Sequence, residues 1–171
     1  MLSDRGTAAT LRPDELDDGW LDGCDHLFVS GYALFVEPVR SAARAAVAAA
    51  RERGAAVSVD LASWSGIRDS GPELVRALLG ELAPDVVFAN EDEKRTLGDT
   101  TGAATWIVKR GGRGCRFGDD ERPALAVGHV VDTTGAGDAL AAGYILGGPG
   151  LALEAAARCV RQVGAMPALE N

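Results

Sequence analysis

The amino-acid sequence predicts an α/β fold in which helices cover both faces of a mostly parallel β-sheet. Short apolar segments of strand length alternate along the chain with segments rich in Ala and Leu, which favour helices. Glycine, proline and polar residues separate these segments, as they do at turns. The chain has 171 residues, of which 47% are hydrophobic, enough for one domain with a buried core. Such alternation indicates a parallel sheet.

The first part of the chain alternates between expected strands and helices. Residues 14–21, after Pro13, predict a short acidic helix, and the Ala-rich residues 38–53, followed by Gly54, predict a longer one. Two further helices are expected at residues 72–82 and 91–97. The apolar segments predict four strands, at residues 26–30, 56–61, 85–89 and 105–109.

The pattern changes after residue 109. Residues 114–117 and 124–131 flank the turn-rich segment 118–121, and together they predict a β-hairpin. Two helices are expected to complete the chain, at residues 137–146 and 151–163. The sequence Gly-Gly-Pro-Gly at residues 147–150 separates them.

Composition argues against several classes of function. The formal net charge is −8 and no basic stripe offsets it, which argues against a nucleic-acid partner. No apolar run is long enough to cross a bilayer and no signal peptide is recognisable, so we expect no membrane partner. The three cysteines (Cys24, Cys115 and Cys159) lie far apart and suggest neither a disulfide framework nor a zinc site. We therefore expect a soluble, cytoplasmic protein.

The strongest chemical signal is the segment 132–138, with the sequence Asp-Thr-Thr-Gly-Ala-Gly-Asp. It lies between an apolar segment and a helix-forming one. Its small residues let the backbone approach a ligand, and unpaired N–H groups at a helix start attract anions. Asp138 closes the loop where the helix dipole favours a negative charge. The segment predicts a phosphoryl group held by backbone amides beside an ionised base; the alternative is an ordinary turn capped by Asp132 or Thr134.

Other polar residues fall where expected strands end. Asp60 closes one strand, and Asn90 and Glu93 follow the next. Lys109 ends the strand that precedes the glycine turn 111–114. Ligands of parallel sheets bind beyond the carboxyl ends of the strands, so we expect these residues to converge on one crevice. The alternatives are an ordinary helix start for Asn90 and Glu93, a solvated Lys109 and a turn cap for Asp60.

Two familiar nucleotide-binding motifs are absent from the sequence. No segment has the Gly-x4-Gly-Lys-Ser/Thr pattern of a Walker A loop. A dinucleotide fingerprint that started at Gly135 would require Gly or Ala where Leu140 stands. The anion site at the helix start therefore belongs to another class.

Four motifs, in order, resemble those of the ribokinase-like (PfkB) carbohydrate kinases. Segment 132–138 resembles the family's second signature, and Asn-Glu-Asp-Glu at residues 90–93 resembles its Asn-x-x-Glu motif. Residues 108–114, Val-Lys-Arg-Gly-Gly-Arg-Gly, resemble its nucleotide-side strand and glycine turn, and residues 155–169 resemble its closing helix. The resemblance implies a ribokinase-like three-layer α/β/α fold. It also implies that residues 1–171 are a single, partial kinase domain.

The resemblance implies ATP-dependent phosphorylation of a sugar or nucleoside hydroxyl. Asp138 would be the base that takes the proton from the acceptor hydroxyl. The N–H groups of Gly135, Ala136 and Gly137 would stabilise charge on the transferred phosphoryl group.

The resemblance also assigns binding roles to the remaining residues. Asn90 and Glu93 would organise Mg²⁺, mainly through water, and Asp132 and Thr134 are positions for a monovalent cation such as K⁺. Asp60 would face the substrate. The nucleotide would be bound by Lys109, Gly111, Gly112 and Gly114.

Parts of the family pattern are missing from the sequence. The first half of a family member supplies most of the sugar contacts and a β-sheet lid, and nothing here matches either part. We therefore expect an N-terminally truncated fold that lacks the lid and the first strands. The alternative to a kinase is a non-catalytic nucleotide-binding module or gene remnant, with a homodimer or a partner chain at the exposed sheet edge. The acceptor sugar is not identified, because residues 60–64 lack the Asn of the family's Asp-x-Asn-x-Arg motif.

Overall fold

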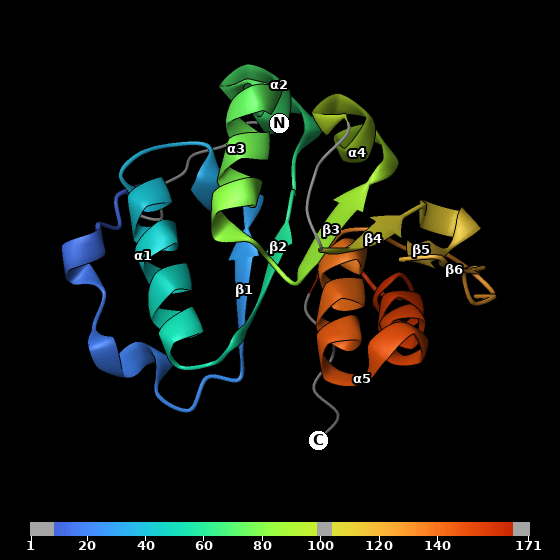
Figure 1. Ribbon diagram of the computed structural model, residues 1–171. Helices are drawn as coiled ribbons and strands as arrows, with labels where there is room; N and C mark the ends of the chain where they lie inside the picture. The colour runs from blue at the N-terminus through green and yellow to red at the C-terminus, as the bar shows by residue number, and fades with distance from the viewer. Residues whose placement is uncertain (1–8, 99–103, 166–171) are drawn as a thin grey trace. The chain divides into compact units, whose positions relative to one another are not determined.

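The computed structural model describes residues 9–98 and 104–165, and within them it contains a mixed sheet of six strands (Figure 1). The strands follow one another in the sheet in sequence order, from β1 to β6. The chain divides into two compact units, residues 1–106 and residues 107–171. The alternation of strands and helices confirms the predicted α/β class.

The sheet of the first unit consists of three parallel strands. They are β1 (His26–Ser30), β2 (Ala56–Asp60) and β3 (Val86–Asn90). Val57, Val59 and Val87 are almost fully buried, as expected for parallel strands. Because Asp60 pairs with Phe88, Asp60 and Asn90 lie at the same edge of this sheet, as the strand-end prediction requires.

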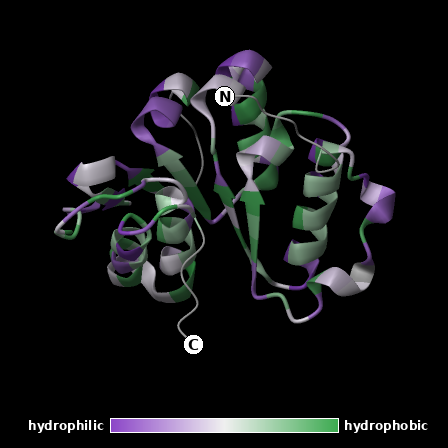
Figure 2. Ribbon diagram, turned by 180° about the vertical axis from the view of Figure 1, so that it is seen from behind, coloured by the Kyte–Doolittle hydropathy of each residue, from purple (hydrophilic) through white to green (hydrophobic). Residues whose placement is uncertain are grey.

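Helices of the first unit pack their apolar stripes against this core. They are α1 (Val39–Glu52), α2 (Trp64–Ser70), α3 (Pro72–Leu82) and α4 (Glu91–Leu97). In α1 the buried residues Ala43, Val47 and Ala50 are spaced by four and three positions, so they share one helix face. Figure 2 shows this unit's strands as largely hydrophobic. The predicted helices 38–53, 72–82 and 91–97 are confirmed within one residue at each end.

The start of the chain and helix α2 differ from the prediction. The expected helix 14–21 is instead two 3-10 turns, η2 (Pro13–Glu15) and η3 (Asp18–Leu21). Asp17 is extended and its side chain accepts a hydrogen bond from Gly19 N at 2.7 Å, which interrupts a continuous helix. Helix α2 was not predicted, because Gly66 in its first turn disfavours a helix. A Cβ on Gly66 would lie 2.3 Å from the Phe35 ring, so close packing requires this glycine.

The second unit contains a small antiparallel sheet. Strand β4 (Thr105–Lys109) runs into this unit from the first and pairs with β5 (Cys115–Phe117), which pairs with β6 (Asp120–Arg122). The predicted hairpin exists, but its second arm was predicted wrongly at residues 124–131. Phe117 pairs with Asp120, so the turn is only two residues long and the returning strand is polar and exposed. Residues 124–131 form no strand.

Helix α5 (Ala136–Cys159) contains the first helix predicted after the loop and most of the second, which ends at Cys159 instead of residue 163. Gly147 and Gly148 have non-helical backbone angles and Pro149 follows them, so the run is kinked where the sequence predicted a break. Of the helices in the described part of the chain, only α5 passes a test of length and apolar composition for a membrane-spanning helix. The kink divides it into two helices shorter than the roughly 20 residues that a membrane span requires.

Candidate active site

The carboxylate of Asp132 holds the start of the 132–138 loop. Its Oδ2 accepts a hydrogen bond from Gly164 N at 2.9 Å, and its Oδ1 accepts from Thr134 N at 2.9 Å and Thr134 Oγ1 at 2.7 Å. The Gly164 N–H, followed by the two Thr134 donors, lowers the pKa of Asp132 to about 2. Asp132 therefore stays ionised and ties the loop to the chain beyond α5.

Helix α5 begins inside this loop, as the sequence predicted. Gly135 is its N-cap with φ 78°, and a Cβ there would lie 2.5 Å from the Cβ of Ala165, so only glycine fits. The first N–H groups of a helix lack partners within the helix and attract anions. The Ala136 N–H donates to Thr133 O at 3.2 Å and so closes the turn. Asp138 is exposed in the first turn.

The side chain of Lys109 lies against the start of α5. A Cβ built on Gly137 would lie 3.4 Å from the Lys109 Nζ and 3.6 Å from its Cδ. The ammonium group thus stands at the helix end whose dipole favours negative charge. The N-terminus of α5 and the Lys109 ammonium group both attract anions. They were predicted separately from the sequence and are adjacent in the structure.

The glycine turn after β4 contains two different kinds of glycine. Gly111, with φ 57°, and Gly112 have open space where a Cβ would lie. Gly114 does not, because a Cβ there would lie 2.0 Å from the carbonyl oxygen of Arg122. The hairpin backbone therefore requires Gly114, whereas Gly111 and Gly112 leave the backbone open to a ligand.

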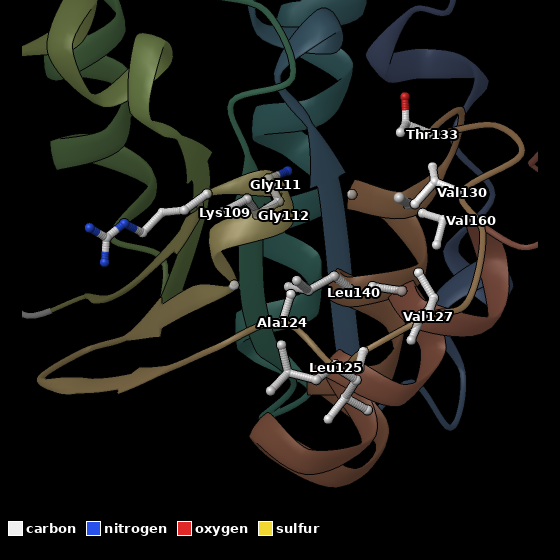
Figure 3. A pocket seen from close by; sticks show the side chains of 18 residues that line it. Lys109, Gly111, Gly112, Ala124, Leu125, Val127, Val130, Thr133, Leu140 and Val160 are labelled. Atoms are coloured by element: carbon white, nitrogen blue, oxygen red, sulfur yellow. The ribbon is translucent and has the colours of Figure 1, made fainter.

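A cavity of about 490 Å³ connects these features within the second unit (Figure 3). Its size suits a nucleotide or another small molecule. Lys109, Gly111, Gly112 and Gly137 all line it, and most of the remaining wall is Ala, Val and Leu. The cavity therefore combines an anion-binding side with an apolar side.

The apolar wall is the part of the site that sequence reasoning missed. Leu125, Val127 and Val130 line the cavity from segment 124–131, which we predicted as a strand. Their apolar side chains were visible in the sequence and could have indicated a ligand-binding wall. We assigned them to burial in a sheet, whereas Leu125 and Val130 are 46% and 49% exposed.

In the first unit, Asn90 and Glu93 form a complete capping box at the start of α4. Asn90 Oδ1 accepts from Glu93 N, and Glu93 accepts from Asn90 N through Oε2 and from Asn90 Nδ2 through Oε1, each at 2.8 Å. Glu93 is only 3% exposed. The structure thus shows the helix-start alternative directly, and a Mg²⁺ role for this pair is an additional proposal.

Asp60 is buried at the end of β2. Its Oδ1 accepts a hydrogen bond from Ala62 N at 3.0 Å, and Ala62 has φ 59°. The carboxylate therefore stabilises a tight turn in left-handed backbone geometry, as the turn-cap alternative predicted. Asp60, Asn90 and Glu93 belong to the first unit, whereas Lys109 and the 132–138 loop belong to the second.

Comparison with known proteins identifies the family. The model of the pfkB family of carbohydrate kinases matches residues 1–169. The chain belongs to the pfkB family. An ATP-dependent ribose-1-phosphate kinase of Halopiger xanaduensis is 32% identical over 157 residues, which cover 85% of this chain and 48% of that protein. The chain spans about half the length of such pfkB relatives.

Solved structures of sugar and nucleoside kinases share the fold. An adenosine kinase of Sinorhizobium meliloti superposes with a TM-score of 0.81 at 23% identity, covering 93% of this chain and 56% of that one. A fructokinase of Vibrio cholerae O395, solved with fructose, ADP and a calcium ion, gives a TM-score of 0.72 at 26% identity, covering 95% of this chain and 62% of that one. The ribokinase-like fold expected from the motifs is confirmed.

Proposed function

We propose that residues 1–171 act as one partial kinase domain, which transfers the γ-phosphoryl group of ATP to a hydroxyl group of a sugar or nucleoside. The observation that carries this proposal is the position of Lys109 beside Gly137, at the start of α5 and in the wall of the apolar cavity. The negative charge of a triphosphate would be complementary to the Lys109 side of the cavity, and a nucleobase would pack against its Ala, Val and Leu side chains. A cytoplasmic location would supply the ATP.

The chemistry requires positioning and charge stabilisation more than covalent participation by the protein. The N–H groups of Gly135 and Gly137 would donate to oxygens of the transferred group, and Lys109 would add its positive charge. The Ala136 N–H, expected from the sequence to join them, already donates to Thr133 O, so we give it no part in this step. As the acceptor oxygen bonds to the γ-phosphorus, the bond from phosphorus to the bridging oxygen breaks and ADP leaves. Asp138, exposed in the first turn of α5, would take the hydroxyl proton.

We propose that Asn90 and Glu93 would hold a magnesium ion through bridging water. Both carboxylate oxygens of Glu93 accept a hydrogen bond from Asn90, so the pair presents an ordered, largely buried carboxylate. Bound Mg²⁺ would neutralise charge on the ATP phosphates. The relative solved with ADP and a calcium ion supports a divalent cation in this family.

A monovalent cation such as K⁺ fits the loop less well. Both Asp132 oxygens accept hydrogen bonds, and the Thr134 carbonyl accepts one from Cys159 Sγ at 3.4 Å. A cation there would have to share oxygens that the loop already uses. We therefore assign no step of the reaction to K⁺.

The test of this function is transfer from [γ-³²P]ATP by the purified chain to ribose, ribose 1-phosphate, fructose and adenosine. Replacing Asp138 by Asn should abolish transfer to every acceptor while changing the Kd for ATP less than about threefold, because the side chain keeps its size. If the Asp138→Asn variant kept most of the transfer activity, Asp138 would not be the base.

A second candidate is a nucleotide-binding module that needs a complementing chain before it can transfer phosphate. It is favoured by β1, which ends the strand order and carries Phe28 with 41% of its surface exposed. Light scattering would then show a dimer of the purified chain, or a complex with a co-expressed upstream segment. A monomer that transfers phosphate alone would exclude this candidate.

A further inference from the structure

The turn that follows α5 holds the start of the 132–138 loop, because α5 folds back on itself at its kink (Figure 1). Val160 O accepts hydrogen bonds from Val131 N at 2.8 Å and from Asp132 N at 3.4 Å. The Gly164 N–H donates to Asp132 Oδ2 at 2.9 Å. Backbone groups of the turn therefore fix the chain where it enters the loop, whatever side chains the turn carries.

One side chain at the end of α5 adds a bond further along the loop. Cys159 is the last residue of α5 and is 6% exposed, and its Sγ–H donates to the Thr134 carbonyl oxygen at 3.4 Å. Burial, followed by the charges of Asp132 and Asp138, raises the pKa of the Cys159 thiol. The thiol therefore keeps the proton that this hydrogen bond requires.

This bond fixes the direction of an amide that we assign to the phosphate site. The Thr134 carbonyl and the Gly135 N–H belong to one trans peptide, in which the two groups lie in a plane and point in opposite directions. The N–H and Oγ1 of Thr134 both donate to Asp132 Oδ1. The carbonyl is thus the remaining polar group of Thr134, and the thiol holds it. A carbonyl held on one side aims the Gly135 N–H on the other.

We infer, on the basis of the proposed function, that Cys159 is a positioning residue for phosphoryl transfer and acts by aiming the Gly135 N–H at the transferred group. Removing a donor that stabilises charge in the transition state costs about 10²–10³ in kcat. Misorienting such a donor costs less than removing it, so loss of the thiol should lower kcat by about tenfold. The KM for ATP should change less than about twofold, because this interaction strengthens mainly in the transition state.

The test compares Cys159→Ala with Cys159→Ser in the full chain. The two replacements differ by one hydroxyl group, and only serine offers the Thr134 carbonyl a donor. In steady-state transfer from [γ-³²P]ATP, we expect kcat to fall about tenfold in the alanine variant and to stay within about threefold of the wild type in the serine variant. Equal kcat values for the two variants overturn the inference, because a merely structural loss of the sulfur affects both alike.

Nuclear magnetic resonance tests the same peptide without relying on turnover. The ¹³C′ chemical shift of Thr134 reports the hydrogen bond at its carbonyl, and we expect it to change in Cys159→Ala. On addition of MgADP and aluminium fluoride, which mimic the transferred group, the Gly135 amide signal should move less in this variant than in the wild type. An unchanged Thr134 shift overturns the inference even where the chain transfers phosphate. If the wild type neither transfers phosphate nor responds to the mimic, the proposed function fails and the inference fails with it.

Discussion

Replacing Gly137 by Ala should separate the stability of α5 from its ability to bind phosphate. Gly137 lies in the first turn of α5, where alanine favours the helix by about 0.5–1 kcal/mol. The new Cβ would lie 3.4 Å from the Lys109 Nζ. It would therefore occupy space in which, on our proposal, a phosphate oxygen would bridge the helix amides and the ammonium group. We expect a more stable protein that binds ATP poorly.

The loss of binding can be estimated from one charge-assisted hydrogen bond. Such a bond contributes about 1.5–3 kcal/mol, so the Kd for ATP should rise by roughly 10- to 100-fold. Urea denaturation would measure stability and calorimetry would measure the Kd. Gly150→Ala is the matched control, because Gly150 also lies in α5 and has open space where its Cβ would be. A Gly137→Ala variant that binds ATP like the wild type would refute the anion site.

Two further predictions concern carboxylates. The pKa of Asp132 is lowered in the folded protein to about 2, below the unfolded value of about 3.9, so its contribution to stability is present above about pH 4 and is lost as the pH falls toward 2. Asp132→Asn should remove that part of the pH dependence in denaturation curves recorded between pH 2 and 6; an unchanged profile would contradict the role of Asp132 in the loop. Glu93→Gln keeps one acceptor oxygen for Asn90 N but turns its amide NH2 toward Asn90 Nδ2, so it should lose about 1 kcal/mol of stability together with the Mg²⁺ dependence of ATP binding. Calorimetry with and without Mg²⁺ would show the difference, and a Glu93→Gln variant that kept its full Mg²⁺ dependence would leave Glu93 with only its capping role.

Most of the fold followed from local sequence patterns. Helix α1 was predictable because Ala-rich periodicity and the terminating Gly54 agree, and β2 because its apolar run is short and ends in a polar residue. Helix α2 was not predictable, because Gly66 disfavours a helix locally. The reason for a glycine there is its packing against the ring of Phe35, a residue distant in sequence. Such tertiary contacts override local propensity.

In the candidate site, too, some features follow from local sequence and others depend on tertiary contacts. The 132–138 loop and Lys109 were identified from sequence, but their proximity depends on how β4 and α5 pack. Segment 124–131 was mistaken for a strand because residues that line a ligand cavity are as apolar as residues buried in a sheet. The capping box of Asn90 and Glu93 was foreseen as an alternative, since Asn followed by Glu three positions later serves both a helix start and a metal site.

Hydrogen–deuterium exchange of the full chain with and without saturating MgATP tests the nucleotide site most directly. We predict slower exchange in residues 109–114 and in the 132–138 loop, because their backbone amides would contact the phosphates. We predict no comparable change in α1, which contributes nothing to the cavity lining. Unchanged exchange in both segments while ATP is bound would show that the nucleotide lies elsewhere and would contradict the proposed site.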